Sequence, residues 1–231
     1  FAGATVTSGA VDAGGRAIRA QSTNGNVSVT TTGNIVSRAL NAISISGTSF
    51  DVTTASGTTV TSNGGTAAIA GGASAGNGLV ISNGTVAARG VAETGIGITT
   101  TGNATVVSNI ITVEGTMAPT SGFSSGGISA VSNGGGNVSV TAQNTTVQGV
   151  GRYGIFASTT GAGTVGITSG ITSNVADGLA AVFAQSDTGA ITLNTGTTAA
   201  ASATAVFAKT GGLVTVNAAS STASGNRSSG V

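Results

Sequence analysis

The chain of 231 residues contains no histidine, cysteine or tryptophan, and only one tyrosine, one methionine and one proline. Zinc, haem, iron–sulfur and copper centres depend on histidine or cysteine ligands, so the composition excludes these metal sites. Ser-His-Asp and Cys-His catalysis is excluded for the same reason. We therefore expect a protein that is not an enzyme and that uses no metal or cofactor.

Charge is also scarce, with seven basic and six acidic residues and a net charge of +1. A surface that binds nucleic acid electrostatically needs a basic stripe, which seven scattered cations do not provide. A single proline excludes collagen, and a positive mean hydropathy with little net charge disfavours a disordered chain. No run of about 18 strongly apolar residues is present, so we expect no segment that inserts into a membrane.

The sequence is rich in small and β-branched residues and contains 40 glycines. A repeated pattern organises these residues along the chain. An aliphatic residue follows a small one and is followed two positions later by another small or aliphatic residue, as in Gly-Ile-Phe-Ala at 154–157. These aliphatic anchors recur at intervals of 24 to 32 residues. They are Ile18, Ile43, Ile69, Ile96, Ile128, Ile155, Val182 and Val206.

A second set of apolar residues lies about ten positions after each anchor and alternates with polar or small residues. Such alternation is typical of a strand with one buried face. The predicted inward pairs are Val27/Val29, Phe50/Val52, Leu79/Ile81, Ala104/Val106, Val138/Val140, Val165/Ile167, Ile191/Leu193 and Val214/Val216. A third, looser column contains Ile35, Val60, Val86, Ile111, Val147 and Ile171.

Three short strands in each repeat of about 27 residues predict an all-β fold, a right-handed, three-sided parallel β-helix of about eight to nine coils. A β-sandwich also has alternating strands, but it does not place eight anchors in one register. We expect residues 1–231 to form a single solenoid segment. The chain begins at Phe1 and shows no polar cap at either end, so we expect it to be part of a longer solenoid or to stack end to end.

One repeat is about five residues longer than the others and contains the only proline. The extra residues predict a protruding loop over 115–127. Met117 and Phe123 in this loop are candidates for a binding tip, although such side chains often fold back onto the flank of a solenoid.

Runs such as Gly-Asn-Val-Ser-Val-Thr at 25–30 and again at 136–141, together with the Gly-Ile-Phe-Ala anchors, resemble the passenger domains of bacterial autotransporters. The resemblance rests on the style of the repeat and covers the whole chain. It implies a β-helical stalk that is exported through the outer membrane and displayed on the bacterial cell surface. Such passengers serve in adhesion, autoaggregation or biofilm formation. The C-terminal barrel of a complete family member has no counterpart in this sequence.

Two other functions fit the sequence less well than a surface stalk does. Enzymes that act on polysaccharides need clustered carboxylates, whereas the acids here occupy different phases of the repeat. Ice binding needs a regular threonine array, which Ser28, Thr30, Ser139 and Thr141 suit but Asp51, Val80 and Gly166 interrupt. Asn-x-Ser/Thr triplets at Asn26, Asn83, Asn103, Asn137, Asn144 and Asn226 are expected to serve turns through left-handed backbone geometry and side-chain hydrogen bonds.

Three aromatic residues, Phe156, Phe183 and Phe207, follow the anchors of three consecutive repeats. Arg19 occupies the same column in an earlier repeat, so we expect the column to face outward. The three rings would then form an apolar contact stripe for a second molecule of the protein or for a glycan. The sequence thus predicts a non-catalytic surface stalk of an adhesin, secreted or cell-bound, with a self-assembling extracellular filament subunit as the alternative.

Overall fold

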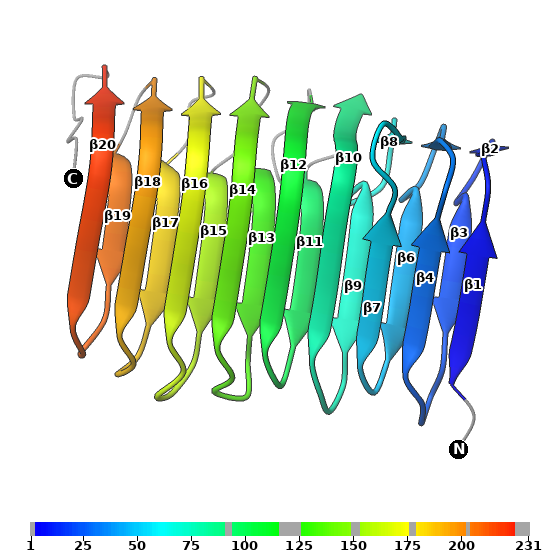
Figure 1. The fold of residues 1–231 in the computed structure, drawn as a ribbon, viewed down its shortest axis with the longest axis horizontal. Coiled ribbons are helices and arrows are strands. Elements are labelled where there is room, and N and C mark those ends of the chain that lie inside the picture. Colours follow the sequence, from blue (N-terminus) through cyan, green and yellow to red (C-terminus); the bar gives the residue numbers. More distant parts are fainter. Residues whose placement is uncertain are drawn as a thin grey trace.

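The computed structural model describes residues 3–90, 94–115, 126–148, 153–175, 179–201 and 204–224. The regular secondary structure in these ranges consists of β-strands alone, and every strand pairing is parallel. The chain winds into a solenoid of about eight turns (Figure 1). Near strands run up and far strands run down in Figure 1 while the chain advances from right to left, which makes the winding right-handed. The predicted fold class is confirmed.

Two sheets form the walls of the solenoid, and we call them the large sheet and the small sheet. The main path of the large sheet comprises β1 (Ala4–Ser8), β4 (Val27–Thr31), β7 (Phe50–Thr54), β10 (Gly78–Gly90), β12 (Ala104–Gly115), β14 (Val138–Val147), β16 (Val165–Asn174), β18 (Ile191–Ala200) and β20 (Val214–Ala223). The small sheet comprises β3 (Ile18–Gln21), β6 (Ile43–Gly47), β9 (Ile69–Ala73), β11 (Thr94–Thr100), β13 (Gly126–Ser132), β15 (Tyr153–Thr159), β17 (Ala180–Ser186) and β19 (Thr204–Lys209).

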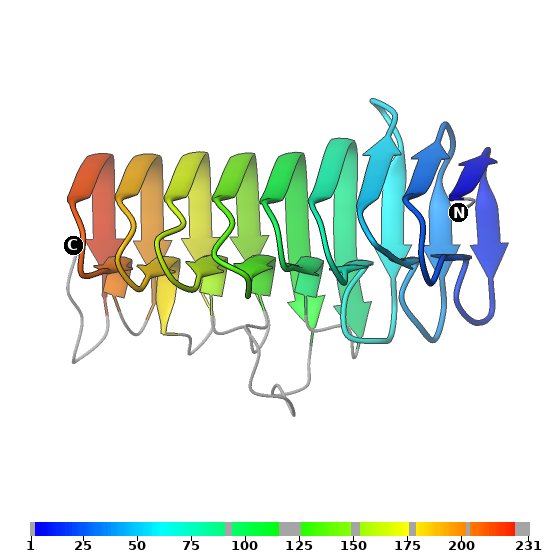
Figure 2. The same cartoon turned by 90° about the horizontal axis from the view of Figure 1, so that it is seen from below.

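The third side of the solenoid changes along its length. In the first three turns it is formed by separate short strands, β2 (Val11–Ala13), β5 (Ile35–Ser37) and β8 (Thr59–Ser62). From β10 onward, one long strand bends across two sides, and β10 pairs with both β7 and β8. Figure 2, seen from below, shows the turns stacked one beside the next along the axis of the solenoid. Within the described ranges, three separate strands per turn, as predicted, are therefore present only in the first three turns.

The anchors lie in the core, in one unbroken register from Ile18 to Val206. Each is at most 5% exposed. The small residue before each anchor lies at a tight corner, where a Cβ on Gly154 would come within 2.6 Å of Thr172 Cγ2. The small-aliphatic motif thus reflects a corner where two walls approach too closely for a larger side chain.

The second column has the predicted inward residues in most turns, but the prediction for β10 was wrong. Gly78 and Val80 face the core, while Leu79 and Ile81 face outward. The cause is Phe50 in the preceding turn, because a Cβ on Gly78 would lie 2.4 Å from its ring. A shift of one residue moves every side chain of a strand to the other face, and here the bulk of Phe50 sets the phase. Val214, in β20, is in register with Ile191 but 40% exposed.

The third column is also corrected in its later turns. Ile35, Val60, Val86 and Ile111 are stacked and buried as predicted. The column then continues through Thr145, Thr172 and Thr198, each 0% exposed. Val147 is buried in the neighbouring column opposite Val113, whereas Ile171 is 53% exposed. Ile111 packs against the corner at Gly95 just as Thr145 and Thr172 pack against the corners at Gly127 and Gly154, so the corner glycines do not account for the change to threonine.

Hydrogen bonds to asparagine side chains connect successive turns, in addition to the backbone hydrogen bonds between strands. The backbone N–H of Asn103 donates to Oδ1 of Asn77, and the N–H of Asn137 donates to Oδ1 of Asn103, each at 2.8 Å. The Thr164 N–H continues this ladder to Asn137 at 2.9 Å. The predicted side-chain bonds are thus present at Asn103 and Asn137, but the predicted left-handed geometry is wrong for the asparagines among the described residues, because positive φ angles there occur only at glycines.

Candidate functional site

An aromatic ladder on the outer side of the small sheet is the most distinctive surface feature of the protein. It is formed by Phe156, Phe183 and Phe207, which are paired in register on β15, β17 and β19. The ring centroids of Phe156 and Phe183 are 5.2 Å apart and those of Phe183 and Phe207 are 4.9 Å apart. The interplanar angles of 12° and 14° show that the rings stack nearly face to face.

Tyr153 belongs to this ladder, although the sequence pattern did not single it out. Its ring lies 5.0 Å from that of Phe156 and 5.1 Å from that of Phe183, tilted against both. Tyr153 begins β15, three residues before Phe156, and in a regular strand this odd spacing places two side chains on opposite faces, so alternation did not indicate the contact. Since the faces of the inner rings are covered by one another, the ladder presents mainly ring edges to its surroundings. Phe207 is 38% exposed and is the most open member.

The same outer side of the small sheet is hollowed over its first turns. The hollow has a volume of about 460 Å³ and is lined by Ser22, Ser46, Gly72, Ser74 and Thr99, among others. It exists because Gly72, which points outward between Ser46 and Thr99, has no side chain, and a Cβ built there would have no atom within 4 Å. One face thus carries an aromatic ridge at one end and an open hollow lined by small residues at the other.

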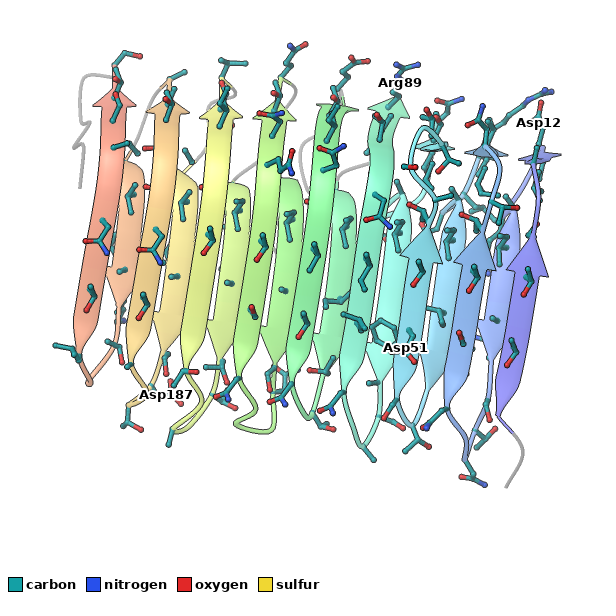
Figure 3. The ribbon with its side chains drawn as sticks, in the orientation of Figure 1. Asp12, Asp51, Arg89 and Asp187 are labelled. Atoms are coloured by element: carbon teal, nitrogen blue, oxygen red, sulfur yellow. The ribbon has the colours of Figure 1, made fainter. Side chains whose placement is uncertain are left out.

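The acidic residues that the structure describes are dispersed along the solenoid. Asp12 pairs with Arg38 at 2.6 Å and Glu114 pairs with Arg89 at 3.3 Å, each pair joining adjacent turns. Asp187 accepts a hydrogen bond from the Gly161 N–H at 2.8 Å. Figure 3 shows Asp12, Asp51, Arg89 and Asp187 at separate places on the solenoid. No group of three potential metal-ligating side chains occurs among the described residues.

The outer side of the large sheet carries two columns of short side chains. One column contains Thr5, Ser28, Asp51, Leu79, Thr105, Ser139, Gly166, Thr192 and Thr215. The predicted interruptions by Asp51 and Gly166 are present, but Val80 is buried and does not interrupt this face. Leu79 and Ile81 interrupt it instead.

The predicted loop over 115–127 is wrong at its two ends, and residues 116–125 lie outside the described residues. Gly115 is the last residue of β12, and Gly126 and Gly127 belong to β13. Met117 and Phe123 lie outside the described residues, as do Glu93, Asp177, Asn226 and Val231.

Within the described part of the chain no helix is able to span a membrane. Comparison with models of protein families, with curated proteins and with solved structures found no match to this chain. The candidate site therefore rests on its own geometry: a stacked aromatic ridge and an open hollow that share one face of a regular rod.

Proposed function

We propose that the protein is a non-catalytic β-helical stalk of an adhesin, displayed on a bacterial surface or secreted, that promotes adhesion, autoaggregation or biofilm formation. The observation that carries this proposal is the aromatic ladder on a face of a regular rod. Monomeric proteins seldom leave contiguous apolar side chains on their surface unless these contact something. The similarity of the repeats to autotransporter passengers points to the same role.

The construction of the rod supports a load-carrying spacer. Consecutive turns are joined by strand pairing on every side, by the asparagine ladder and by two ion pairs between neighbouring turns. A turn of a solenoid contacts only its neighbours, so a rod of this kind extends by repetition. Eight turns at about 4.8 Å each span roughly 40 Å.

Display on a bacterial surface through a heterologous anchor tests the proposal. Cells that carry the chain should settle or attach to surfaces faster than cells that carry the anchor alone. A variant with serine at positions 156, 183 and 207 should lose most of this gain. The matched control is a variant with serine at positions 105, 141 and 168, three outward threonines of the large sheet, which should retain it.

Equal settling of displayed and anchor-only cells would contradict the proposal. Electron microscopy of the purified chain separates it from the filament alternative, because a stalk gives rods of one length and a filament subunit gives rods of indefinite length.

A further inference from the structure

The corner between the large sheet and the third side of the solenoid becomes shorter along the rod. The strand pairing leaves four residues, 55–58, at this corner in the third turn, two residues, Asn83 and Gly84, in β10, and a single residue in each turn from β12 onward. Figure 2 shows the loop of residues 55–58, in cyan, projecting beyond the level row of bends in the later turns. The corner therefore steps down from a loop to tight bends.

The loop is held in place by two hydrogen bonds. The hydroxyl of Thr58 donates to the Ala55 carbonyl at 2.7 Å, and the Thr59 N–H donates to Oδ1 of Asn34 at 2.8 Å. Gly57, between them, has a φ of 72° that favours glycine. The loop is thus a fixed wall at the upper level of the step.

A groove of about 370 Å³ lies at this step, and we call it the corner groove. Its lining comes from four consecutive turns, with Ser56 in the first of them and Gln143 in the last. Asn83, Asn109 and Gln143 hold the corner in three consecutive turns, and glycine occupies it in the two turns that follow. The four turns span about 14 Å along the rod, so the groove is elongated along the axis.

The three carboxamides present oriented polar groups to the groove. Nδ2 of Asn83 donates to the Thr54 carbonyl at 3.1 Å, and Nδ2 of Asn109 donates to the Asn83 carbonyl at 3.4 Å, so both side chains are tied to the preceding turn. Among the described residues, no hydrogen bond reaches Oδ1 of either asparagine or the side chain of Gln143. The groove therefore offers a row of acceptors, and at Gln143 a donor as well, to a ligand.

The corner groove also has an apolar wall and no charge. Val107 lines it and is 38% exposed, and Ile81 of the preceding turn lies beside Val107 in strand register and faces outward. None of the side chains that line the groove is charged. A charged ligand would lose hydration here without gaining an ion pair, which is unfavourable. The surroundings suit a neutral ligand with both hydroxyl groups and apolar faces.

We propose that the corner groove binds a neutral oligosaccharide that lies along the rod axis. A sugar hydroxyl both donates and accepts, and a carboxamide carries a donor and an acceptor in one plane, so the two match. The carboxamides recur every ~4.8 Å, which is close to the length of one sugar residue in an extended chain. The apolar C–H faces of the sugar rings would pack against Val107 and Ile81, as in binding sites that combine apolar walls with a few placed polar groups.

A peptide fits this groove less well than a sugar does. Extended peptides bind to sheets by adding a strand to an exposed edge through main-chain hydrogen bonds. Here β10 is paired with β7 and β8 on one side and with β12 on the other, and β12 is paired with β14, so this part of the wall has no open edge. The groove is also formed by other residues than the aromatic ladder, so this inference and the stalk proposal can fail independently.

Saturation-transfer NMR of the purified chain tests the proposal with tetrasaccharides of glucose, mannose, galactose and N-acetylglucosamine, and with oligogalacturonate as the acidic counterpart. At least one neutral tetrasaccharide should bind, and oligogalacturonate should not. Gln143→Ala and Asn109→Ala should each weaken binding at least about ten-fold, because each leaves sugar hydroxyls without a partner. Asn194→Ala removes an exposed carboxamide of the large sheet outside the groove and is the matched control, which should leave binding unchanged.

A steric block tests the position of the ligand, since the chain has no cysteine of its own. Ser56→Cys carrying a bulky maleimide should abolish binding, whereas Ser28→Cys with the same label should retain it. Failure of every neutral tetrasaccharide to bind at millimolar concentration, preference for oligogalacturonate, or binding that survives Gln143→Ala but is lost in Phe183→Ser would overturn the proposal. Adhesion of displayed cells in the absence of sugar binding would leave the stalk proposal standing. Circular dichroism confirms that each variant is folded.

Discussion

The first three turns and the later turns place their aromatic side chains on opposite sides of the wall. Phe50, in β7, lies inside the solenoid and is 1% exposed. Phe183, in β17, lies outside and stacks on its neighbours. The difference depends on glycine, because Gly71 and Gly78 in the next turn leave the space that the Phe50 ring fills. The later turns provide no such space inside, so their aromatics are on the surface.

The polarity of the third column changes in the opposite sense. Ile35, Val60 and Val86 fill it in the early turns, and Thr145 and Thr172 fill it in the later ones. The Oγ1 atoms of both threonines are buried with no hydrogen-bond partner. In this column the later turns therefore carry hydroxyls inside, while their aromatic rings lie on the outer side of the small sheet.

The largest expected loss of stability comes from substitutions in the second column of apolar residues, which both regions share. Val52→Asp in the early turns and Val140→Asp in the later ones should each destabilise the protein by several kcal/mol, because a carboxylate would face a column with no partner. Ser139→Asp, one residue away but exposed, should cost under about 0.5 kcal/mol. Urea denaturation followed by circular dichroism measures all three, and similar losses at Val140 and Ser139 would contradict the assigned faces.

The next effect separates the two kinds of phenylalanine. Phe50→Ala should destabilise by about 3–5 kcal/mol, since it leaves a cavity in the core. Phe183→Ala should cost about 1–2 kcal/mol in the monomer, mostly lost ring contacts. Thermal unfolding at low protein concentration gives both values, and a larger loss at Phe183 would reverse the comparison.

Two buried threonines of the later turns allow a test in which the same substitution changes the free energy of unfolding in opposite directions. Thr172→Val removes a buried hydroxyl without a partner and should stabilise by about 1 kcal/mol. Thr159→Val removes a hydroxyl that donates to the Gly136 carbonyl at 2.6 Å and should destabilise by about 1 kcal/mol. Chemical denaturation of the two variants side by side measures the difference, and a loss at Thr172 would mean that its hydroxyl is satisfied in solution.

The smallest effect concerns the ion pairs. Arg38 and Asp12 are 65% and 56% exposed at their side chains, so their coupling should be below about 1 kcal/mol and should fall as salt is added. A double-mutant cycle with Arg38→Met and Asp12→Asn measures it in low and high salt. A coupling that is large or insensitive to salt would show that this exposed pair holds the early turns together.

The burial of a side chain could be predicted from the sequence where its own size and polarity, and those of its neighbours in the chain, all indicate the same face of the strand. Ile43, Ile128 and Ile155 each follow a small residue and recur at a regular spacing, so their burial was predictable. The faces of Leu79 and Ile81 were not, because they depend on Phe50 in the preceding turn rather than on their own segment. Ile171 misled because the strand pairing places Thr172, and not Ile171, in register with Thr145 of the third column. The outward position of the three phenylalanines follows from their shared column and is confirmed, whereas the hollow at Gly72 depends on a missing side chain that alternation does not reveal.

The hydrogen bonds between strands lie along the axis of the rod, and this has a mechanical consequence. Tension applied to the two ends pulls directly on the bonds between one turn and the next, so the rod yields by peeling, one turn at a time. Each released turn of about 27 residues adds up to roughly 90 Å of slack chain before the next turn is loaded. A molecule built in this way is stiff under small forces and lengthens in steps under large ones, as a shock absorber does.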